Sequence, residues 1–295
     1  MNHHKNPTSL VSTEWVVNHL HDSNVRIVEV IWGSQEGYTT GHIPGAVAWD
    51  FAVDYGMNQG DIISQTDFEK QLMVSGIYPE TTVVLYSAFN NLLATFEFWL
   101  MKYYGHKDAR LLDGDKAKWL TENRPLERDI PSYLPSTYRA KAPDVSIRAT
   151  KKEILELTGK TDILLVDARS AEMYRGEFFP STQRGGHIPG AINLAAILEV
   201  QPDGSFIGWK VPTVREDGTF KTSQELKGLF EGLGITADKE IITYCLRGGL
   251  STHAWFVLTQ LLGYPKVREY DRSWGEWGNS KDLPVVKGTD PYGNE

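Results

Sequence analysis

The chain contains an internal repeat, and this repeat constrains the fold more than any other feature of the sequence. The run Gly-His-Ile-Pro-Gly-Ala-Val begins at Gly41, and Gly-His-Ile-Pro-Gly-Ala-Ile begins at Gly186. Further along the chain Tyr86 corresponds to Tyr244, and the later matches keep that same spacing. Since 295 residues suffice for two domains of about 150 residues each, the repeat predicts two related domains.

Each half of the chain shows the same alternation of predicted strands and helices. The second half has strands at 163–168, 240–244 and 266–270, and helices at 223–233 and 250–262. The first half has strands at 26–31, 82–86 and 110–112, and helices at 68–75 and 92–104. Strands that alternate with helices form right-handed crossovers and a parallel sheet. The sequence therefore predicts an α/β fold with two domains, each a mainly parallel sheet flanked by helices.

A proline-rich stretch separates the two copies. It spans 121–149 and holds Pro125, Pro131, Pro135 and Pro143. Prolines at this density favour an extended connection over a helix. We therefore expect a first domain at 1–124, a linker at 125–146 and a second domain at 147–295. An irregular flap of the first domain is the alternative interpretation, and it moves the boundary little.

The composition is that of an ordinary folded protein, with 41% hydrophobic residues and a net charge of -8. An acidic chain lacks the positive surface that nucleic-acid binding requires, so no nucleic-acid partner is expected. No apolar run approaches the roughly 18 residues that span a bilayer, and no secretory signal pattern follows the first residues. We expect no membrane partner and a cytoplasmic location. A local basic pocket can still bind a small anion.

Cys245 is the single cysteine of the chain. One cysteine excludes an intrachain disulfide framework and a cysteine-cluster metal site. We therefore expect no metal at this position, and any sulfur chemistry has one place to occur.

Features that both copies share are expected to serve the fold. His42 and His187 lie in the repeated Gly-His-Ile-Pro-Gly motif, which suits a tight turn before a strand. Asp167 corresponds to Glu29 at the end of a predicted strand. We interpret these histidines and carboxylates as structural residues rather than groups that transfer protons.

The position after the strand that ends at Tyr86 or Tyr244 differs between the copies. It is Ser87 in the first and Cys245 in the second, where the loop Cys-Leu-Arg-Gly-Gly-Leu-Ser leads into a predicted helix. Backbone N–H groups in such a loop, together with a helix N-terminus, stabilise an anion. An ordinary thiol has a pKa of about 8.5, and this setting favours its thiolate form. The alternative is that Cys245 is only a small buried hydrophobic residue.

Arginines are also concentrated in the second copy, where the first copy has other residues. They suggest a local anion pocket in an acidic protein, although each could instead be a surface ion-pair partner. The five positions are Arg169, Arg175, Arg184, Arg247 and Arg272.

These motifs together resemble the rhodanese family, specifically the tandem-domain bacterial thiosulfate sulfurtransferases. The resemblance covers nearly the whole chain and rests on both Gly-His-Ile-Pro-Gly-Ala motifs, the Val-Asp-Ala-Arg strand end at Arg169, the loop after Cys245 and the run Asp-Arg-Ser-Trp at Asp271. It implies two tandem rhodanese-like domains, of which the first is catalytically silent. The pair Ser87 and Cys245 fits that pattern.

The resemblance further implies a two-step mechanism. The Cys245 thiolate attacks the outer sulfur of thiosulfate, sulfite leaves, and a persulfide then passes its sulfur to a thiophilic acceptor such as cyanide. This ping-pong scheme needs neither a metal nor an organic cofactor. The partners are thus a small anionic sulfur donor and the acceptor. The residues expected to bind the donor are Arg247, Gly248, Gly249, Leu250, Ser251, Arg184 and Arg175.

The sequence departs from the family pattern in two places. Animal enzymes have two adjacent cations after the cysteine, whereas here Leu246 precedes the single cation Arg247. Mercaptopyruvate-using relatives have an uncharged loop, so Arg247 favours thiosulfate. Those relatives also carry a substrate-binding arginine where this chain has Met173, and Arg175 or Arg184 is the candidate replacement.

Three alternatives remain beside a thiosulfate sulfurtransferase. A cysteine phosphatase requires Cys-x5-Arg, and Ser251 stands at the arginine position. A 3-mercaptopyruvate sulfurtransferase is the nearest alternative. A sulfur-carrier or partner-binding rhodanese module, without turnover of its own, is the third.

Ser87 of the first copy is not expected to be a nucleophile, because it lacks the Gly-x-Ser-x-Gly surroundings of a serine nucleophile.

Overall fold

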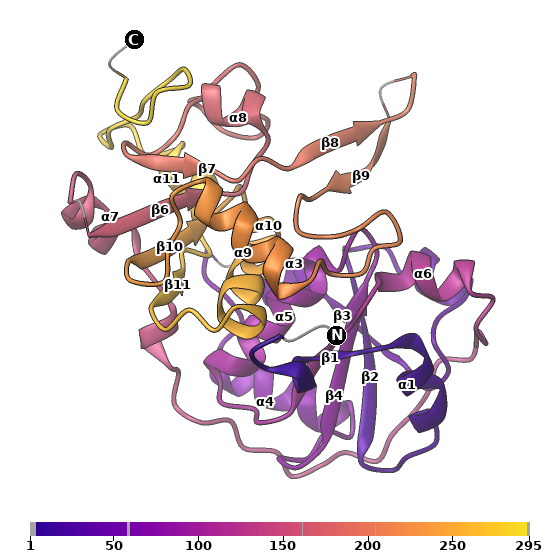
Figure 1. Cartoon of the computed structure of the whole chain (residues 1–295). Helices are drawn as coiled ribbons and strands as arrows, with labels where there is room; N and C mark the ends of the chain where they lie inside the picture. Colours follow the sequence, from indigo (N-terminus) through magenta and orange to yellow (C-terminus); the bar gives the residue numbers. More distant parts are fainter. Residues whose placement is uncertain (1–3, 58–59, 161, 204, 294–295) are drawn as a thin grey trace. The chain divides into compact units, whose positions relative to one another are not determined.

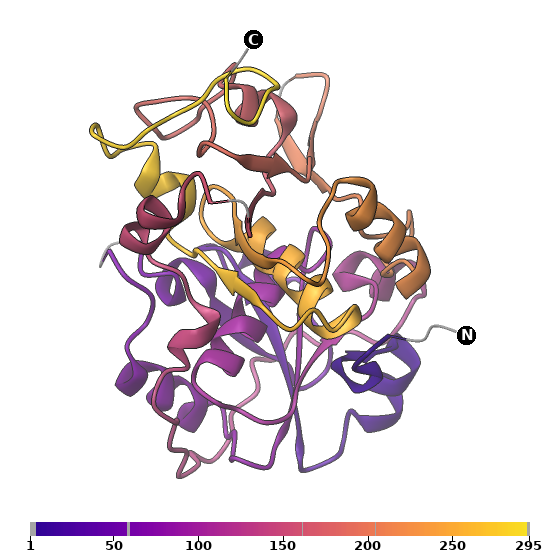
Figure 2. The ribbon, with the colours of Figure 1, turned by 60° about the vertical axis from the view of Figure 1, so that its left-hand side comes forward.

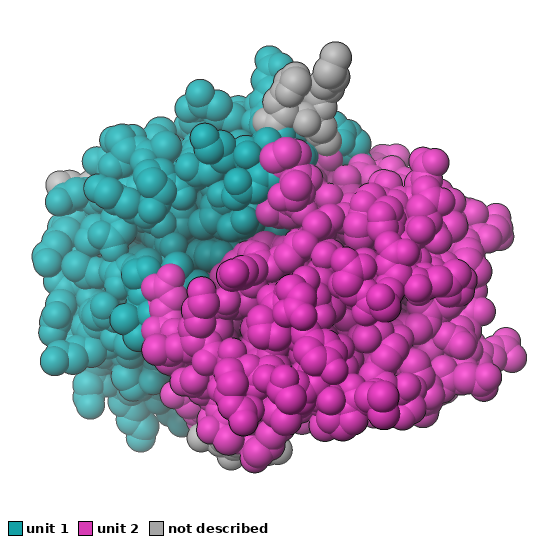
Figure 3. Space-filling view, turned by 90° about the horizontal axis from the view of Figure 1, so that it is seen from below, with its two compact units in different colours: residues 1–6, 145–215, 221–295 teal, residues 7–144, 216–220 magenta. Residues whose placement is uncertain are grey.

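The computed structural model describes residues 4–57, 60–160, 162–203 and 205–293. The chain divides into two compact units, coloured separately in Figure 3. Unit 1 comprises Met1–Asn6, Val145–Arg215 and Lys221–Glu295, and unit 2 comprises Pro7–Asp144 and Glu216–Phe220. Each unit therefore includes a short segment from the other half of the sequence. This division does not test the boundaries expected from the sequence, namely a first domain at 1–124, a linker at 125–146 and a second domain at 147–295, so these stay predictions.

Unit 2 is built on a parallel sheet of strand order β1-β5-β4-β2-β3. The order along the sheet is β1 (Leu10–Val11), β5 (Ala109–Leu112), β4 (Thr82–Ser87), β2 (Val25–Ile31) and β3 (Val47–Asp50). All its strand pairings are parallel. β2 and β4 are buried along their whole length, as expected for central strands covered on both faces.

The helices of unit 2 follow the strands in the predicted alternation. The largest is α5 (Leu92–Tyr103), which packs against β2, β4 and β5 and is buried almost all round. Ser64 caps α4 (Gln65–Val74) by accepting a hydrogen bond from the Asp67 N–H. The remaining helical segments are η1 (Pro7–Ser9), α1 (Thr13–His19), α2 (Glu36–Thr39), α3 (Phe51–Asp54), α4 (Gln65–Val74) and α6 (Asp115–Thr121).

Unit 1 repeats this plan with a parallel sheet of order β11-β10-β6-β7, which Figure 2 shows from a second side. The strands are β11 (Val267–Glu269), β10 (Glu240–Tyr244), β6 (Ile163–Asp167) and β7 (Ala191–Asn193). An antiparallel hairpin of β8 (Ile197–Val200) and β9 (Phe206–Lys210) extends from this sheet (Figure 1). The two sheets confirm the α/β fold with mainly parallel strands.

The central helix of unit 1 is α10 (Gly249–Phe256), which packs against β10 and β11 and continues into a π-helical turn, η3 (Val257–Leu261). Capping boxes begin α7 (Lys151–Leu157), where Thr150 pairs with Glu153, and α9 (Ser223–Gly232), where Thr222 pairs with Glu225. The other helical segments are η2 (Val145–Ile147), α7 (Lys151–Leu157), α8 (Ala171–Arg175), α9 (Ser223–Gly232) and α11 (Ser273–Trp277). None of the described helices is long and apolar enough to cross a membrane.

The repeated Gly-His-Ile-Pro-Gly motif has the same contacts in both units. His42 stacks on Tyr38, and His187 stacks on Tyr174. In each pair the histidine Nδ1 lies 3.0 or 2.9 Å from the tyrosine carbonyl oxygen, so Nδ1 carries the hydrogen. Both histidines are fully buried, which supports their structural interpretation.

Unit 2 also buries two carboxyl groups side by side. Asp54 on α3 and Glu97 on α5 are fully buried, and the Gln71 amide donates to Asp54 at 3.0 Å. Burial raises the pKa of Asp54 to about 6 and, together with the nearby Asp54 charge, raises the pKa of Glu97 well above its usual value. A group with a raised folded-state pKa binds its proton more tightly in the folded protein. Folding stability that depends on this proton is lost as the pH rises through the folded-state pKa.

We therefore expect the wild-type protein to lose stability relative to the Asp54→Asn variant as the pH rises from about 4 to above 6. The raised pKa of Asp54 corresponds to a change of about 3 kcal/mol in the free energy of unfolding over this pH range. Urea unfolding of both proteins at several pH values measures the difference. Asp67→Asn is the matched control, because Asp67 is exposed and water screens its contact with Lys70, so its effect on stability should depend little on pH. A pH-independent difference between wild type and Asp54→Asn would contradict the account.

Candidate functional site

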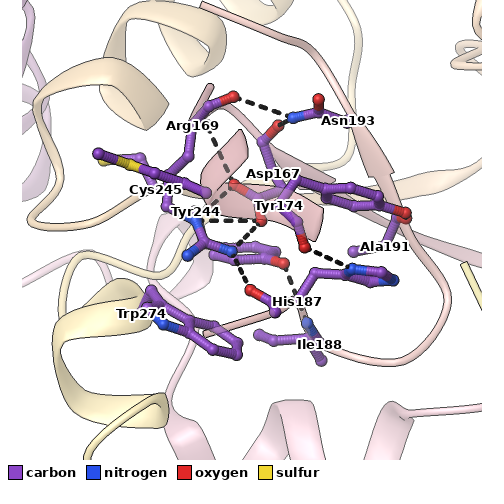
Figure 4. Close-up of polar contacts among 12 residues, drawn as sticks. Asp167, Arg169, Tyr174, His187, Ile188, Ala191, Asn193, Tyr244, Cys245 and Trp274 are labelled. Carbon is purple, nitrogen blue, oxygen red and sulfur yellow. Dashed lines mark hydrogen bonds and ion pairs between the residues drawn. The ribbon is translucent and has the colours of Figure 1, made fainter. Parts of the chain in front are cut away.

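Cys245 lies at the carboxyl end of β10, in the loop that leads into α10 (Figure 4). Its side chain is buried, with only 2% of the residue exposed. The Cys245 N–H donates to the Ser273 hydroxyl at 3.0 Å, and the Cys245 carbonyl accepts from the Trp274 N–H at 3.0 Å. The Gly275 N–H donates to the Leu246 carbonyl at 3.0 Å. The first turn of α11 thus holds the backbone of Cys245 and Leu246 in place.

Gly248 gives the loop its shape. It precedes the first residue of α10 with φ 86° and ψ -32°, in the left-handed region that residues with a Cβ rarely adopt. Its carbonyl accepts hydrogen bonds from the hydroxyls of Thr252 at 2.8 Å and Ser251 at 3.1 Å. The glycine therefore lets the chain turn from strand to helix within a few residues of Cys245.

The polar groups around the thiol come from the loop, from the first turn of α10 and from the neighbouring strand β11. The Ser251 hydroxyl is 3.4 Å from the Cys245 Sγ. Burial and the charge of Glu269 raise the pKa of Cys245, while the Ser251 hydroxyl and the backbone N–H groups of Ser251 and Arg247 act to lower it. The amides are placed as the sequence predicted. The net direction is opposite to the expected lowering of the pKa, because burial outweighs the amides.

Glu269 is the neighbour that the sequence analysis missed. It lies on β11, fully buried, and accepts hydrogen bonds from the hydroxyls of Ser251 and Thr243. The signal was present in the repeat, since the corresponding residue of the first copy is the apolar Leu111. A carboxyl group at a position where the fold accepts leucine is a candidate functional residue.

Arg169 forms a buried ion pair beside the cysteine (Figure 4). Its guanidinium binds both carboxylate oxygens of Asp167, donates to the Gly186 carbonyl at 2.7 Å and lies 4.4 Å from the Trp274 ring centroid. Asp167 thus fixes an arginine, in keeping with its structural interpretation. The corresponding Glu29 of unit 2 is held by Tyr86 and Lys116 instead.

Arg247 lies in the loop itself and is partly exposed. In the part of the chain that the structure describes, no carboxylate forms an ion pair with its guanidinium. Gly249, Leu250 and Ser251 form the first turn of α10, so the structure brings the predicted loop residues together around Cys245.

Arg175 and Arg184 are engaged by other groups. Arg175 pairs with Glu177 at 2.7 Å and with Glu172 at 3.8 Å. Arg184 donates to four backbone carbonyls of the C-terminal segment, which belong to Trp277, Ser280, Lys281 and Leu283. These contacts favour structural roles, so donor binding by either arginine stays a prediction without geometric support.

Two hollows lie near the ends of the strands in unit 1. One has a volume of about 10 Å³, room for roughly one water molecule, and Leu250 and His253 of α10 contribute to its wall. The other has a volume of about 310 Å³ and follows β6 and β7. Its lining residues are Ser170, Ala171, Glu172, Phe178, Ala195, Ala196, Ile197 and Leu198.

Comparison with known proteins identifies relatives along the whole chain. A model of the rhodanese-like domain matches twice, at residues 12–122 and 150–280. The sulfur carrier protein TtuD of Thermus thermophilus is 45% identical over 296 residues, which cover 96% of this chain and 98% of TtuD. A candidate thiosulfate sulfurtransferase of Haloferax volcanii is 38% identical over 291 residues, which cover 95% of this chain and 96% of that protein.

Solved structures show the same similarity. The anaerobic ergothioneine biosynthesis enzyme of Chlorobium limicola, in complex with trimethyl histidine, has a TM-score of 0.86 and 26% identity, and the match covers 98% of this chain and 72% of that one. A structure of EanB with a cysteine persulfide and ergothioneine has a TM-score of 0.84, 26% identity and the same coverage. With two matches to the family model and relatives across its length, this chain belongs to the rhodanese family of sulfurtransferases.

Proposed function

We propose that the protein is a thiosulfate sulfurtransferase that carries sulfur as a persulfide of Cys245. The observation that carries this proposal is the position of the single thiol. Cys245 lies between the end of β10 and the start of α10, facing a hydroxyl and two backbone N–H groups, where the other copy has Ser87. The family membership and the names of the relatives support the same chemistry.

The first step transfers sulfur to the protein. The Cys245 thiolate attacks the outer sulfur of thiosulfate, a new S–S bond forms, and the S–S bond of thiosulfate breaks with its electron pair leaving on sulfite. The loop amides that face Sγ, those of Ser251 and Arg247, are then placed to stabilise the anionic persulfide.

The second step regenerates the thiolate. An acceptor such as cyanide attacks the terminal sulfur, forms thiocyanate and leaves the electron pair of the broken S–S bond on Cys245. Neither step requires a metal or an organic cofactor.

Arg247 is the proposed contact for the thiosulfate dianion, because its cation lies in the loop next to the nucleophile without an ion-pair partner among the described residues. We expect Arg247→Gly to lower kcat/KM for thiosulfate by about tenfold to a hundredfold, the range of one charged hydrogen bond. The effect on 3-mercaptopyruvate should be smaller.

A donor panel tests both the proposal and its nearest alternative. Release of sulfite from thiosulfate and of pyruvate from mercaptopyruvate is measured for wild type, Arg247→Gly and the control Arg215→Gln, whose arginine pairs with Glu225 instead. The thiosulfate assignment requires sulfite release by wild type and a changed donor preference in Arg247→Gly alone. Faster turnover of mercaptopyruvate, unaffected by Arg247, would identify a mercaptopyruvate sulfurtransferase.

One observation favours a second candidate function. The relative at 45% identity is named a sulfur carrier protein. In that role Cys245 would form the same persulfide but deliver it to a protein acceptor rather than to cyanide. Persulfide formation with very slow thiocyanate production would favour the carrier over the enzyme.

A further inference from the structure

A buried polar triad lies beneath the cysteine loop. Glu269 on β11 accepts hydrogen bonds from the hydroxyls of Thr243 on β10 and Ser251 on α10. All three residues are fully buried, and the Ser251 hydroxyl also lies 3.4 Å from the Cys245 Sγ. A continuous chain of polar atoms therefore joins the nucleophile to a carboxyl group inside the protein.

The other copy of the repeat has no polar atom at any of these side chains. The residues that correspond to Thr243, Ser251 and Glu269 are Leu85, Leu93 and Leu111. The strand registers agree, since Leu85 pairs with Leu111 between β4 and β5 as Thr243 pairs with Glu269 between β10 and β11. The fold therefore accepts leucine at all three positions, and burying a carboxyl group instead is costly. The polar triad is therefore present only in the copy that contains Cys245, and the fold does not require it.

Hydrogen counting shows how the triad can act. The Ser251 hydroxyl has one hydrogen but faces three acceptors, namely the Cys245 Sγ, the Gly248 carbonyl and Glu269. If Glu269 is ionised, Ser251 donates to it and can accept a hydrogen from the thiol. If Glu269 is protonated, it donates to Ser251, whose own hydrogen then turns to the sulfur. The direction of the hydroxyl thus depends on which end of the chain holds the proton.

We propose that Glu269 is a positioning residue that takes the proton of the Cys245 thiol through the Ser251 hydroxyl. The S–H bond of Cys245 and the O–H bond of Ser251 break, while a new O–H bond forms at Ser251 and another at Glu269. No proton enters or leaves the site, and no electron is transferred. The products are a thiolate, which accepts a hydrogen bond from Ser251, and a neutral carboxyl group.

The electrostatic surroundings suit this exchange. Burial, with a smaller contribution from the charge of Asp271, raises the pKa of Glu269 well above its usual value, so this carboxylate binds a proton more readily than an exposed glutamate does. Asp271 is itself paired with Arg148 at 2.8 Å. The charge of Glu269 also raises the pKa of the thiol, and that repulsion vanishes once Glu269 holds the proton. Buried Arg169 interacts electrostatically with Cys245, and its positive charge favours the thiolate.

The inference rests on the proposed nucleophilic role of Cys245, but its test does not require sulfur transfer. Because Cys245 is the single cysteine, the ultraviolet absorbance of its thiolate can be followed against pH and corrected with the Cys245→Ser variant. A proton that moves within the pair leaves the total number of bound protons unchanged. Wild type should therefore show a thiolate fraction that is nearly constant between the two titration steps of the pair.

The variants remove the acceptor or the link. In Glu269→Gln the thiol must lose its proton to water, so the thiolate should rise about tenfold per pH unit and be largely absent at pH 7. Ser251→Ala removes the hydroxyl that donates to the thiolate, so the constant thiolate fraction between the two titration steps should be lower than in wild type. Ser251→Thr keeps a hydroxyl and should restore the thiolate fraction of the wild type. Glu240→Gln is the matched control and should behave as wild type. Glu240 lies on β10, the strand of Thr243, and its partly exposed carboxylate pairs with Arg268.

The possible results separate cleanly. More thiolate at neutral pH in Glu269→Gln than in wild type would show that Glu269 acts only as a repelling charge, and it would overturn the proposal. An unchanged profile in Ser251→Ala would overturn it as well. Circular dichroism confirms that each variant is folded. Absence of thiosulfate turnover beside a constant wild-type thiolate fraction would instead reject the proposed function and leave the relay intact.

Discussion

Replacement of Cys245 by serine is expected to abolish sulfur transfer while leaving the fold intact. Serine is the residue at the corresponding place of the other copy, where Ser87 is fully buried and its N–H donates to the Asn91 side chain at 2.8 Å. A hydroxyl cannot form the persulfide, and loss of a nucleophile costs about a thousandfold or more in turnover. Steady-state release of sulfite from thiosulfate measures the effect.

The repeat supplies the control for this prediction. Ser87→Ala removes the hydroxyl at the corresponding position of unit 2 and should leave the rate unchanged within about twofold, if unit 2 is catalytically silent. Retained turnover in Cys245→Ser would show that sulfur passes through another group. A large loss in Ser87→Ala would show that the first copy takes part in the reaction.

The second large effect is expected at the ion pair between Asp167 and Arg169. Both residues are almost completely buried, and the guanidinium binds both oxygens of the carboxylate. Asp167→Asn leaves the buried Arg169 cation without its counter-ion. Breaking a buried pair in this way costs about 3–5 kcal/mol of folding free energy. We expect equilibrium urea unfolding to show this loss.

Asp67→Asn provides the matched control for the ion pair. Asp67 makes the same type of charged contact, with Lys70 at 2.9 Å, but both side chains are more than half exposed. Water screens such a pair, so the unfolding midpoint should not change measurably. Equal effects of the two substitutions would contradict the claim that burial makes the Asp167–Arg169 pair essential to stability.

Much of this architecture could be predicted, because the repeat presents two copies of one fold that can be compared with each other. The predicted strand at 240–244 coincides with β10, and the predicted helix at 92–104 differs from α5 by one residue. Both segments carry continuous apolar patterns, which determine buried parallel strands and the helices between them. The same comparison singled out Cys245 against Ser87.

Three features of the structure could not be predicted from the sequence, each for a different reason. The β8–β9 hairpin lies outside the shared repeat, so no second copy indicated it. The predicted helix at 250–262 changes at Val257 into a π-helical turn, which the apolar pattern cannot distinguish from a continuous α-helix. Arg184 is predicted to bind the donor, and the sequence could not show its backbone carbonyl partners, because they belong to residues about a hundred positions away.

The pKa of Cys245 shows the same limit. The glycine-containing loop and helix N-terminus predicted stabilisation of a thiolate, and the structure places the amides of Ser251 and Arg247 accordingly. The sequence could not show how deeply the thiol is buried or that Glu269 lies close to it. Those two features determine the net direction of the pKa, and they come from the packing of β11 and α10.

The central claim is that Cys245 carries the sulfur, and mass spectrometry of the thiosulfate-treated protein tests it most directly. The account predicts one added sulfur atom, located on the peptide that contains Cys245, which disappears on addition of cyanide as thiocyanate forms. An unmodified Cys245 thiol in protein that turns over thiosulfate would contradict it.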